Sequence, residues 1–144
     1  MSTSNLPKVA VGSLGGTISM TPDKAQGGIV PTLSATDLIT VMPGVSAIAN
    51  VRAAALNQVA SIHLKPNDLL TALDWAEQQV AEGAVGVILT QGTDTLEESA
   101  FLLDLLWRHE EPLILMGAMR GAAAVGADGP ANLLNSIQVA VSAN

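Results

Sequence analysis

The sequence contains no cysteine and no tyrosine, and aromatic residues make up only 2% of its 144 positions. The absence of cysteine excludes a disulfide framework, a thiolate metal site and a thiol nucleophile. Because phenylalanine and tryptophan together contribute three side chains, the core has to be built from alanine, valine, leucine and isoleucine. Such a core points to buried strands and helices of small aliphatic residues.

Positive charge is also scarce, with six lysine and arginine residues against thirteen acidic ones and a net charge of −7. The six are not clustered, so there is no basic stripe to follow a phosphate backbone, and we expect no nucleic-acid partner. The two histidines, His63 and His109, have no carboxylates at ligand spacing. We therefore expect no metal site.

Long apolar runs are missing as well. No stretch reaches the roughly 18 apolar residues that a membrane span requires, and no basic segment leads into an apolar run at the start. We therefore expect no membrane segment and predict a cytoplasmic location.

Hydrophobic residues make up 49% of the sequence and charged residues only 13%. This balance excludes a disordered tail, and the length suits one globular domain. So few charges would leave apolar patches larger than a monomer tolerates, so we expect a homo-oligomer.

Apolar runs and helical periodicity alternate along the chain. Short apolar runs predict strands over residues 8–14, 51–56, 59–62, 84–90 and 112–118, and we expect those over 8–14, 84–90 and 112–118 to be buried. Spacing and capping residues predict helices over 34–41, 66–82, 95–108 and 131–142, the third opened by a capping box at Thr95. Residues 20–33, rich in glycine and proline, predict a loop or loose hairpin. Strands alternating with helices predict an α/β fold around a parallel sheet.

Ligands of open parallel sheets bind outside the carboxyl ends of the strands. Three segments are expected there: residues 15–18, 91–95 and 117–120. Thr93 and Asp94 would also lie at a helix N-terminus, where backbone N–H groups favour an anion. These segments therefore hold the candidate ligand-binding residues.

Each segment also has a purely structural interpretation. Gly-Gly-Thr after a strand is often only a turn or a weak phosphate loop. Thr93 or Thr95 could cap a helix, and Asp94 could complement its dipole. Ser61 could be a plain loop residue and Arg120 a brace within a turn. The functional hypothesis therefore depends on the combination.

That combination resembles the bacterial-type L-asparaginase family. The matching motifs occur in order: Gly-Gly-Thr-Ile at 15–18, Gln-Gly-Thr-Asp-Thr-Leu-Glu-Glu-Ser-Ala at 91–100, Gly-Ala-Met-Arg at 117–120 and Ala-Asp-Gly-Pro-Ala-Asn-Leu at 127–133. Ser61, followed by Leu64, Pro66 and Asp68, looks like the substrate-serine segment of the family. The resemblance runs from about Pro7 to the end of the chain.

The resemblance implies a three-layer α/β domain over residues 1–144, with a mostly parallel sheet and helices on both faces. This would be the N-terminal domain of the family, incomplete at its C-terminus and without the smaller C-terminal domain. The implied activity is hydrolysis of L-asparagine, with L-glutamine as a second candidate substrate, to L-aspartate and ammonia. The resemblance further implies a threonine nucleophile, neither metal nor cofactor, and a homo-oligomer that is a dimer or a tetramer.

By position, Thr17 matches the threonine that attacks the side-chain amide and forms the acyl-enzyme. Thr93 matches the second threonine, which activates or positions the attacking group, with Asp94 beside it. Asp94 would also bind the substrate ammonium, and Ser61 with the Thr93 region its carboxylate. Ala118 would line the pocket near the side-chain amide.

The sequence departs from the family pattern at four positions. The lysine of the second triad has no counterpart after the Asp-Gly-Pro helix, and Gly28 stands about where the loop tyrosine falls. Ile62 replaces a common glutamine, and Gln91 a common histidine. We therefore expect this chain to be part of an asparaginase whose activity belongs to the longer enzyme.

Three alternatives remain open. The missing lysine and tyrosine suit an amino-acid or amide binding module without catalysis. An asparaginase-like subunit of a tRNA-dependent amidotransferase shares these motifs, although it carries an additional N-terminal domain, whereas here the first strand begins by Lys8. A generic nucleotide-binding domain is disfavoured, because Gly15-Gly16 does not form a Gly-x-Gly-x-x-Gly fingerprint.

Overall fold

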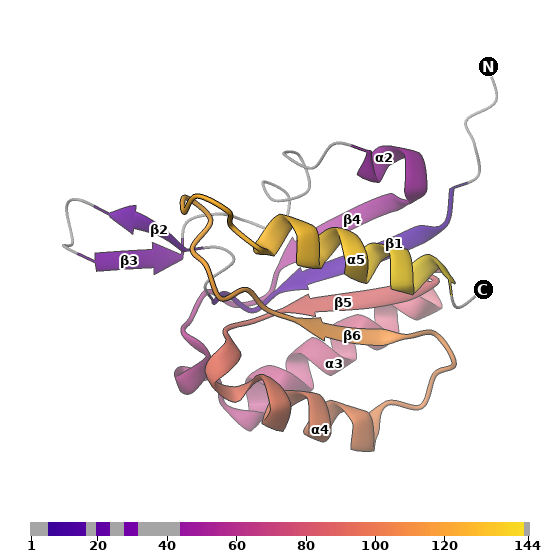
Figure 1. Ribbon diagram of the computed structural model, residues 1–144. Coiled ribbons are helices and arrows are strands. Elements are labelled where there is room, and N and C mark those ends of the chain that lie inside the picture. Colours follow the sequence, from indigo (N-terminus) through magenta and orange to yellow (C-terminus); the bar gives the residue numbers. More distant parts are fainter. Residues whose placement is uncertain (1–5, 17–19, 24–27, 32–43, 143–144) are drawn as a thin grey trace.

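A computed structural model describes residues 6–16, 20–23, 28–31 and 44–142 of the chain. Its centre is a sheet of four parallel strands in the order β4-β1-β5-β6 (Figure 1). The strands are β1 (Lys8–Ser13), β4 (Asn50–Ala55), β5 (Gly86–Thr90) and β6 (Leu113–Met116). The predicted α/β fold with a parallel sheet is confirmed.

Helices cover both faces of this sheet, as the resemblance implied (Figure 1). On one face lie α2 (Val45–Ile48) and α5 (Gly129–Ser142), and on the other α3 (Pro66–Ala81) and α4 (Leu96–Leu106). Leu133 and Ile137 of α5 pack with Ile88 in one core cluster, and Leu69 and Leu103 belong to the cluster on the opposite face. The fold is therefore three-layered.

The two central strands are the most deeply buried elements of the sheet. Every residue of β5 is buried, as is every residue of β1 after Lys8. Burying an aliphatic side chain of this size stabilises the fold by roughly 1.5–3 kcal/mol. The prediction of full burial was wrong for β6, in which Leu113, Ile114 and Leu115 are half-buried because the strand lies at the edge of the sheet.

The ends of α3 follow local signals in the sequence. Pro66 begins the helix, and the Asp68 carboxylate accepts a hydrogen bond of 2.8 Å from the backbone N–H of Lys65. After the helix Gly83 adopts a positive φ of 91°, which glycine allows at little cost. The predicted helix of residues 66–82 is thus confirmed to within one residue.

The predicted capping box at Thr95 is wrong. A single 3₁₀ turn, η3 (Thr93–Thr95), leads into α4, and the Thr95 side chain makes no capping hydrogen bond. Its hydroxyl instead donates to the backbone carbonyl of Ser61 at 3.1 Å. A long-range contact has therefore replaced the expected local one.

The predicted strand over residues 59–62 is also wrong. Val59 donates a backbone hydrogen bond to the carbonyl of Leu14, and residues 61–63 form a second 3₁₀ turn, η2 (Ser61–His63). The chain passes over the end of β1 here, so it cannot continue as a strand beside it.

The loose hairpin predicted within residues 20–33 is confirmed. β2 (Met20–Asp23) pairs antiparallel with β3 (Gly28–Pro31) in a separate two-stranded sheet (Figure 1). The helix predicted over residues 34–41 lies outside the described residues. Within the described ranges no helix has the length and apolar character needed to cross a membrane.

Candidate functional site

The carboxyl ends of β1 and β5 are in direct contact. Leu14 donates a backbone hydrogen bond of 2.8 Å to the carbonyl of Thr90. A Cβ on Gly16 would lie 2.1 Å from the backbone nitrogen of Gly92, and Gly16 has a φ of +88°. Only glycine satisfies both conditions. Thr17 follows directly in the sequence but lies outside the described residues, so its role as nucleophile stays a prediction.

Ser61 and Asp94, two predicted substrate-binding residues, meet at this edge of the sheet. The Ser61 side chain is buried, and its hydroxyl donates to an oxygen of the Asp94 carboxylate at 3.3 Å. A Cβ on Gly92 would lie 2.7 Å from Ser61 Oγ, so the β5 loop packs closely against η2. The structure thus brings together two polar groups that are 33 positions apart in the sequence.

A hydrogen-bond chain that we did not predict holds these two turns together. Gln91 is fully buried, and its amide donates to the Thr95 hydroxyl at 3.4 Å. Thr95 in turn donates to the Ser61 carbonyl, as described above. The only sequence signal was a polar residue directly after an apolar strand. Thr95 therefore positions Ser61, and Gln91 positions Thr95.

Thr93 contacts the segment that follows β6. A Cβ on Gly117 would lie 2.9 Å from Thr93 Cγ2 and 3.0 Å from the Gln91 carbonyl oxygen. The next residue, Ala118, is buried in the core cluster that includes Met116. Thr93 and the end of β6 are therefore neighbours, whereas the predicted role of Ala118 in lining the pocket stays a prediction.

The loop from β6 to α5 is anchored by two residues to which sequence analysis gave no role. The Asp128 carboxylate accepts backbone hydrogen bonds from Met119 at 2.9 Å and Arg120 at 2.8 Å. The hydrogen bond from Met119 has the largest effect and that from Arg120 the next largest. Both stabilise the ionised carboxylate and hold the pKa of Asp128 below its ordinary value of 3.8. Asn132 donates to the Gly117 carbonyl at 3.0 Å, which fixes the glycine beside Thr93.

Arg120 acts as the brace that its structural interpretation anticipated. Its guanidinium donates to the Gly126 carbonyl at 3.0 Å, within the same loop. This contact holds the guanidinium within the loop that follows β6.

Neither histidine lies in a group of side chains that could hold a metal ion within the described residues. His109 Nε2 is 3.8 Å from a carboxylate oxygen of Glu77, and its ring lies against Trp107. His63 is exposed within η2. Across residues 6–16, 20–23, 28–31 and 44–142 there is no group of three histidine or acidic side chains that could hold a metal ion.

Comparison with known proteins points to one family. The family model described as "Asparaginase, N-terminal" matches residues 8–144. Among curated proteins, the chain is 38% identical over 141 residues to "Probable L-asparaginase 4" of Schizosaccharomyces pombe, covering 95% of this chain and 40% of that protein. It is also 29% identical to a glutamyl-tRNA(Gln) amidotransferase subunit of Methanococcus vannielii, covering 94% of this chain and 32% of that protein.

The fold has a close counterpart among solved structures. The "Probable Cytoplasmic L-asparaginase from Campylobacter jejuni" superimposes with a TM-score of 0.83 at 31% identity, over 94% of this chain and 40% of that one. The chain thus spans 40% or less of the length of these three proteins. The family match over residues 8–144 and the shared fold agree with the motifs quoted above, and the chain belongs to the asparaginase family.

Proposed function

We propose that this chain carries the N-terminal half-site of an amidohydrolase that converts L-asparagine and water to L-aspartate and ammonia. The observation that carries the proposal is the contact between Ser61 and Asp94 beside the junction of Gly16 and Gly92. The names of the L-asparaginases to which the chain is similar support the same reaction.

The pair of polar groups suits a free amino acid. The Asp94 carboxylate supplies acceptors for an α-ammonium group, and the Ser61 hydroxyl, whose single proton points to Asp94 in the free chain, can turn to donate to an α-carboxylate when substrate binds. The first turn of α4 follows directly after η3, and its backbone N–H groups also favour the carboxylate. A substrate held in this way would present its side-chain amide toward the ends of β1 and β6.

In the proposed chemistry, the Thr17 hydroxyl attacks the carbonyl carbon of the substrate side-chain amide. The C–N bond breaks, ammonia leaves, and a water molecule then hydrolyses the acyl-enzyme to release L-aspartate. A hydroxyl needs a neighbouring group to accept its proton, and Thr93 is the candidate to position that group. Backbone N–H groups of the glycine-rich strand ends are candidates to stabilise the oxyanion.

The resemblance places the lysine of the second triad after the Asp-Gly-Pro helix, and residues 129–144 contain no lysine. Loss of a general base typically slows such reactions by about 10²–10⁴-fold. We therefore propose that full turnover requires the second domain of the family, and that substrate recognition is the property of this chain that can be tested directly.

The test measures ammonia release and calorimetric binding with L-asparagine, with L-glutamine in parallel. We expect binding that Asp94→Asn weakens and Asp104→Asn, a matched change on the exposed face of α4, leaves unchanged. Any ammonia release should disappear in Thr17→Ala. Absence of binding, or equal binding by both aspartate variants, would contradict the proposed function.

The similarity to an amidotransferase subunit favours a second candidate function. In that case the ammonia would pass to a partner protein rather than to solvent. Free ammonia released by the chain without a partner would argue against this alternative.

We also propose that the chain forms homo-oligomers. Phe101 and Leu105 on α4 expose 67% and 65% of their surface, and Met119 exposes 76%. Exposed apolar residues of this size suit burial against a second copy. Sedimentation analysis that finds only monomers would contradict this. The cytoplasmic location stays a prediction.

A further inference from the structure

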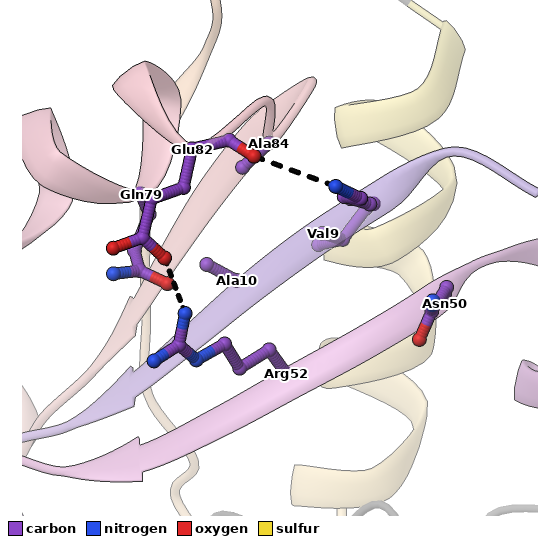
Figure 2. Close-up of a pocket in the computed structure, with 8 residues that line it drawn as sticks. Val9, Ala10, Asn50, Arg52, Gln79, Glu82 and Ala84 are labelled. Atoms are coloured by element: carbon purple, nitrogen blue, oxygen red, sulfur yellow. Dashed lines mark hydrogen bonds and ion pairs between the residues drawn. The ribbon is translucent and has the colours of Figure 1, made fainter.

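A cavity lies at the amino-terminal ends of the strands, opposite the strand ends that hold the Ser61–Asp94 site. It has a volume of about 260 Å³ and lies where β1 and β4 begin, beside the last turn of α3. Figure 2 shows the side chains of Gln79 and Glu82 extending from α3 toward Arg52 on β4. This cavity belongs to no part of the function proposed above.

Apolar residues form one wall of the cavity. Ala10 of β1 and Ala84, which precedes β5, line it from the face of the sheet that α3 covers, whereas the side chain of Val9 packs in the core cluster on the opposite face. The cavity exists because α3 packs on β1 and β5, which leaves the start of the edge strand β4 beside the helix. A ligand with a short carbon skeleton can therefore contact this wall.

The acidic group at the cavity is already satisfied. One oxygen of the Glu82 carboxylate accepts a hydrogen bond of 2.8 Å from Gln78, and the other pairs with the Arg52 guanidinium. The pKa of Glu82 lies below its ordinary value because both hydrogen bonds stabilise the ionised carboxylate, the one from Gln78 more than the one from Arg52. Glu82 therefore stays ionised at neutral pH and needs no further donor.

Arg52, Lys8 and Gln79, by contrast, have N–H groups that are available to a ligand. Arg52 uses one of its guanidinium N–H groups on Glu82, and the Lys8 ammonium makes a single long contact of 3.4 Å with the Glu82 carbonyl. The residue Gln79 is only 3% exposed, and its side-chain amide, which has two N–H donors, lines the cavity. The unused capacity of the cavity consists mainly of hydrogen-bond donors next to positive charge.

We propose that this cavity binds a small organic carboxylate. Arg52 and Lys8 would hold the carboxylate, with the Gln79 amide as a third donor, and the carbon skeleton would lie against Ala10 and Ala84. The planar guanidinium matches a carboxylate in two parallel hydrogen bonds. Since the two cations are largely solvated, we expect an affinity of about 1 mM.

The test uses butyrate as the probe and follows the ¹⁵N-labelled chain by NMR. We expect butyrate to shift the side-chain amide signals of Gln79 and the backbone signals of Val9 and Ala10. Acetate, which lacks the longer skeleton, should bind more weakly, and neutral butyramide should cause no such shifts. Equal shifts with inorganic phosphate would show an adventitious anion site and overturn the proposal.

Variants locate the binding. Arg52→Gln and Gln79→Leu should each weaken butyrate binding by about tenfold, whereas Arg108→Gln, a matched loss of charge outside the cavity, should leave it unchanged. Asp94→Asn should also leave it unchanged, which separates this cavity from the proposed amino-acid site. Binding that survives both cavity variants in a folded chain, or shifts confined to the Asp94 region, would refute the proposal.

Discussion

Replacement of Gly92 by alanine tests whether the close packing of the β5 loop on η2 builds the candidate site. Gly92 has a φ of −67° and a ψ of 153°, a conformation that alanine adopts without strain. The three atoms nearest to the new methyl carbon all belong to Ser61: Oγ at 2.7 Å, Cβ at 3.0 Å and the backbone nitrogen at 3.2 Å. Any loss of stability therefore reports this contact.

The expected magnitude follows from two opposing effects. Forcing a methyl group into a well-packed contact costs about 1–3 kcal/mol. Alanine also restricts the unfolded chain, which returns about 0.4–1 kcal/mol when the native conformation suits it. We therefore expect Gly92→Ala to lower the free energy of unfolding by about 1–2 kcal/mol. For a chain of this length the melting temperature should fall by roughly 3–8 °C.

Urea denaturation followed by circular dichroism measures this effect in a double-mutant cycle with Ser61→Gly. That second substitution removes both of the side-chain atoms that the methyl group would meet. We expect the cost of Gly92→Ala to shrink by about 1 kcal/mol in the Ser61→Gly background. An equal cost in both backgrounds, or a Gly92→Ala variant as stable as the parent, would refute the packing argument.

Two further predictions concern buried and ionised groups near the same edge of the sheet. Thr90 is fully buried and its hydroxyl has no hydrogen-bond partner in the described part of the chain. Because an unsatisfied buried hydroxyl is destabilising, Thr90→Val should raise the free energy of unfolding by about 1 kcal/mol. A lower melting temperature of this variant would contradict the prediction. Asp128 has a pKa below its ordinary value of 3.8, so its ionised form stabilises the folded state above that pH, and this contribution is lost as the pH falls through the lowered pKa. The urea midpoints of the parent and Asp128→Asn should therefore differ at neutral pH and approach each other only as the pH falls below 3.8 and through the lowered pKa. A difference that does not change with pH would show that hydrogen bonding to the ionised carboxylate is not the cause.

Elements with strong local signals were predictable from the sequence. The buried strands over residues 8–14 and 84–90 appear as continuous apolar runs because both of their faces contact helices. Pro66 and Gly83 mark the ends of α3 through their own backbone preferences. The motifs also indicated the asparaginase family, because the glycines and polar residues that follow β1, β5 and β6 occur in the order of that family.

Errors arose where distant parts of the chain compete with local preference. Thr95 has the sequence context of a capping residue, yet its hydroxyl binds the Ser61 carbonyl. Residues 59–62 have the composition of a strand, yet the chain there crosses the end of β1. The burial of β6 was overestimated because its place at the edge depends on the strand order. Each of these outcomes depends on contacts between segments that are far apart in the sequence, so local sequence patterns could not predict it.

In the candidate site, too, the sequence identified the residues and the tertiary structure determined their contacts. Strand-end position indicated Thr93 and Asp94 as binding residues, and the resemblance to the asparaginase family added Ser61, because residue types and motif order are properties of the chain itself. The contact of Ser61 with Asp94, and the hydrogen bonds through Gln91 and Thr95 that support it, exist only in the folded molecule. Parallel strands join at one edge segments that are far apart in sequence, and their close approach depends on Gly16 and Gly92 fitting against each other.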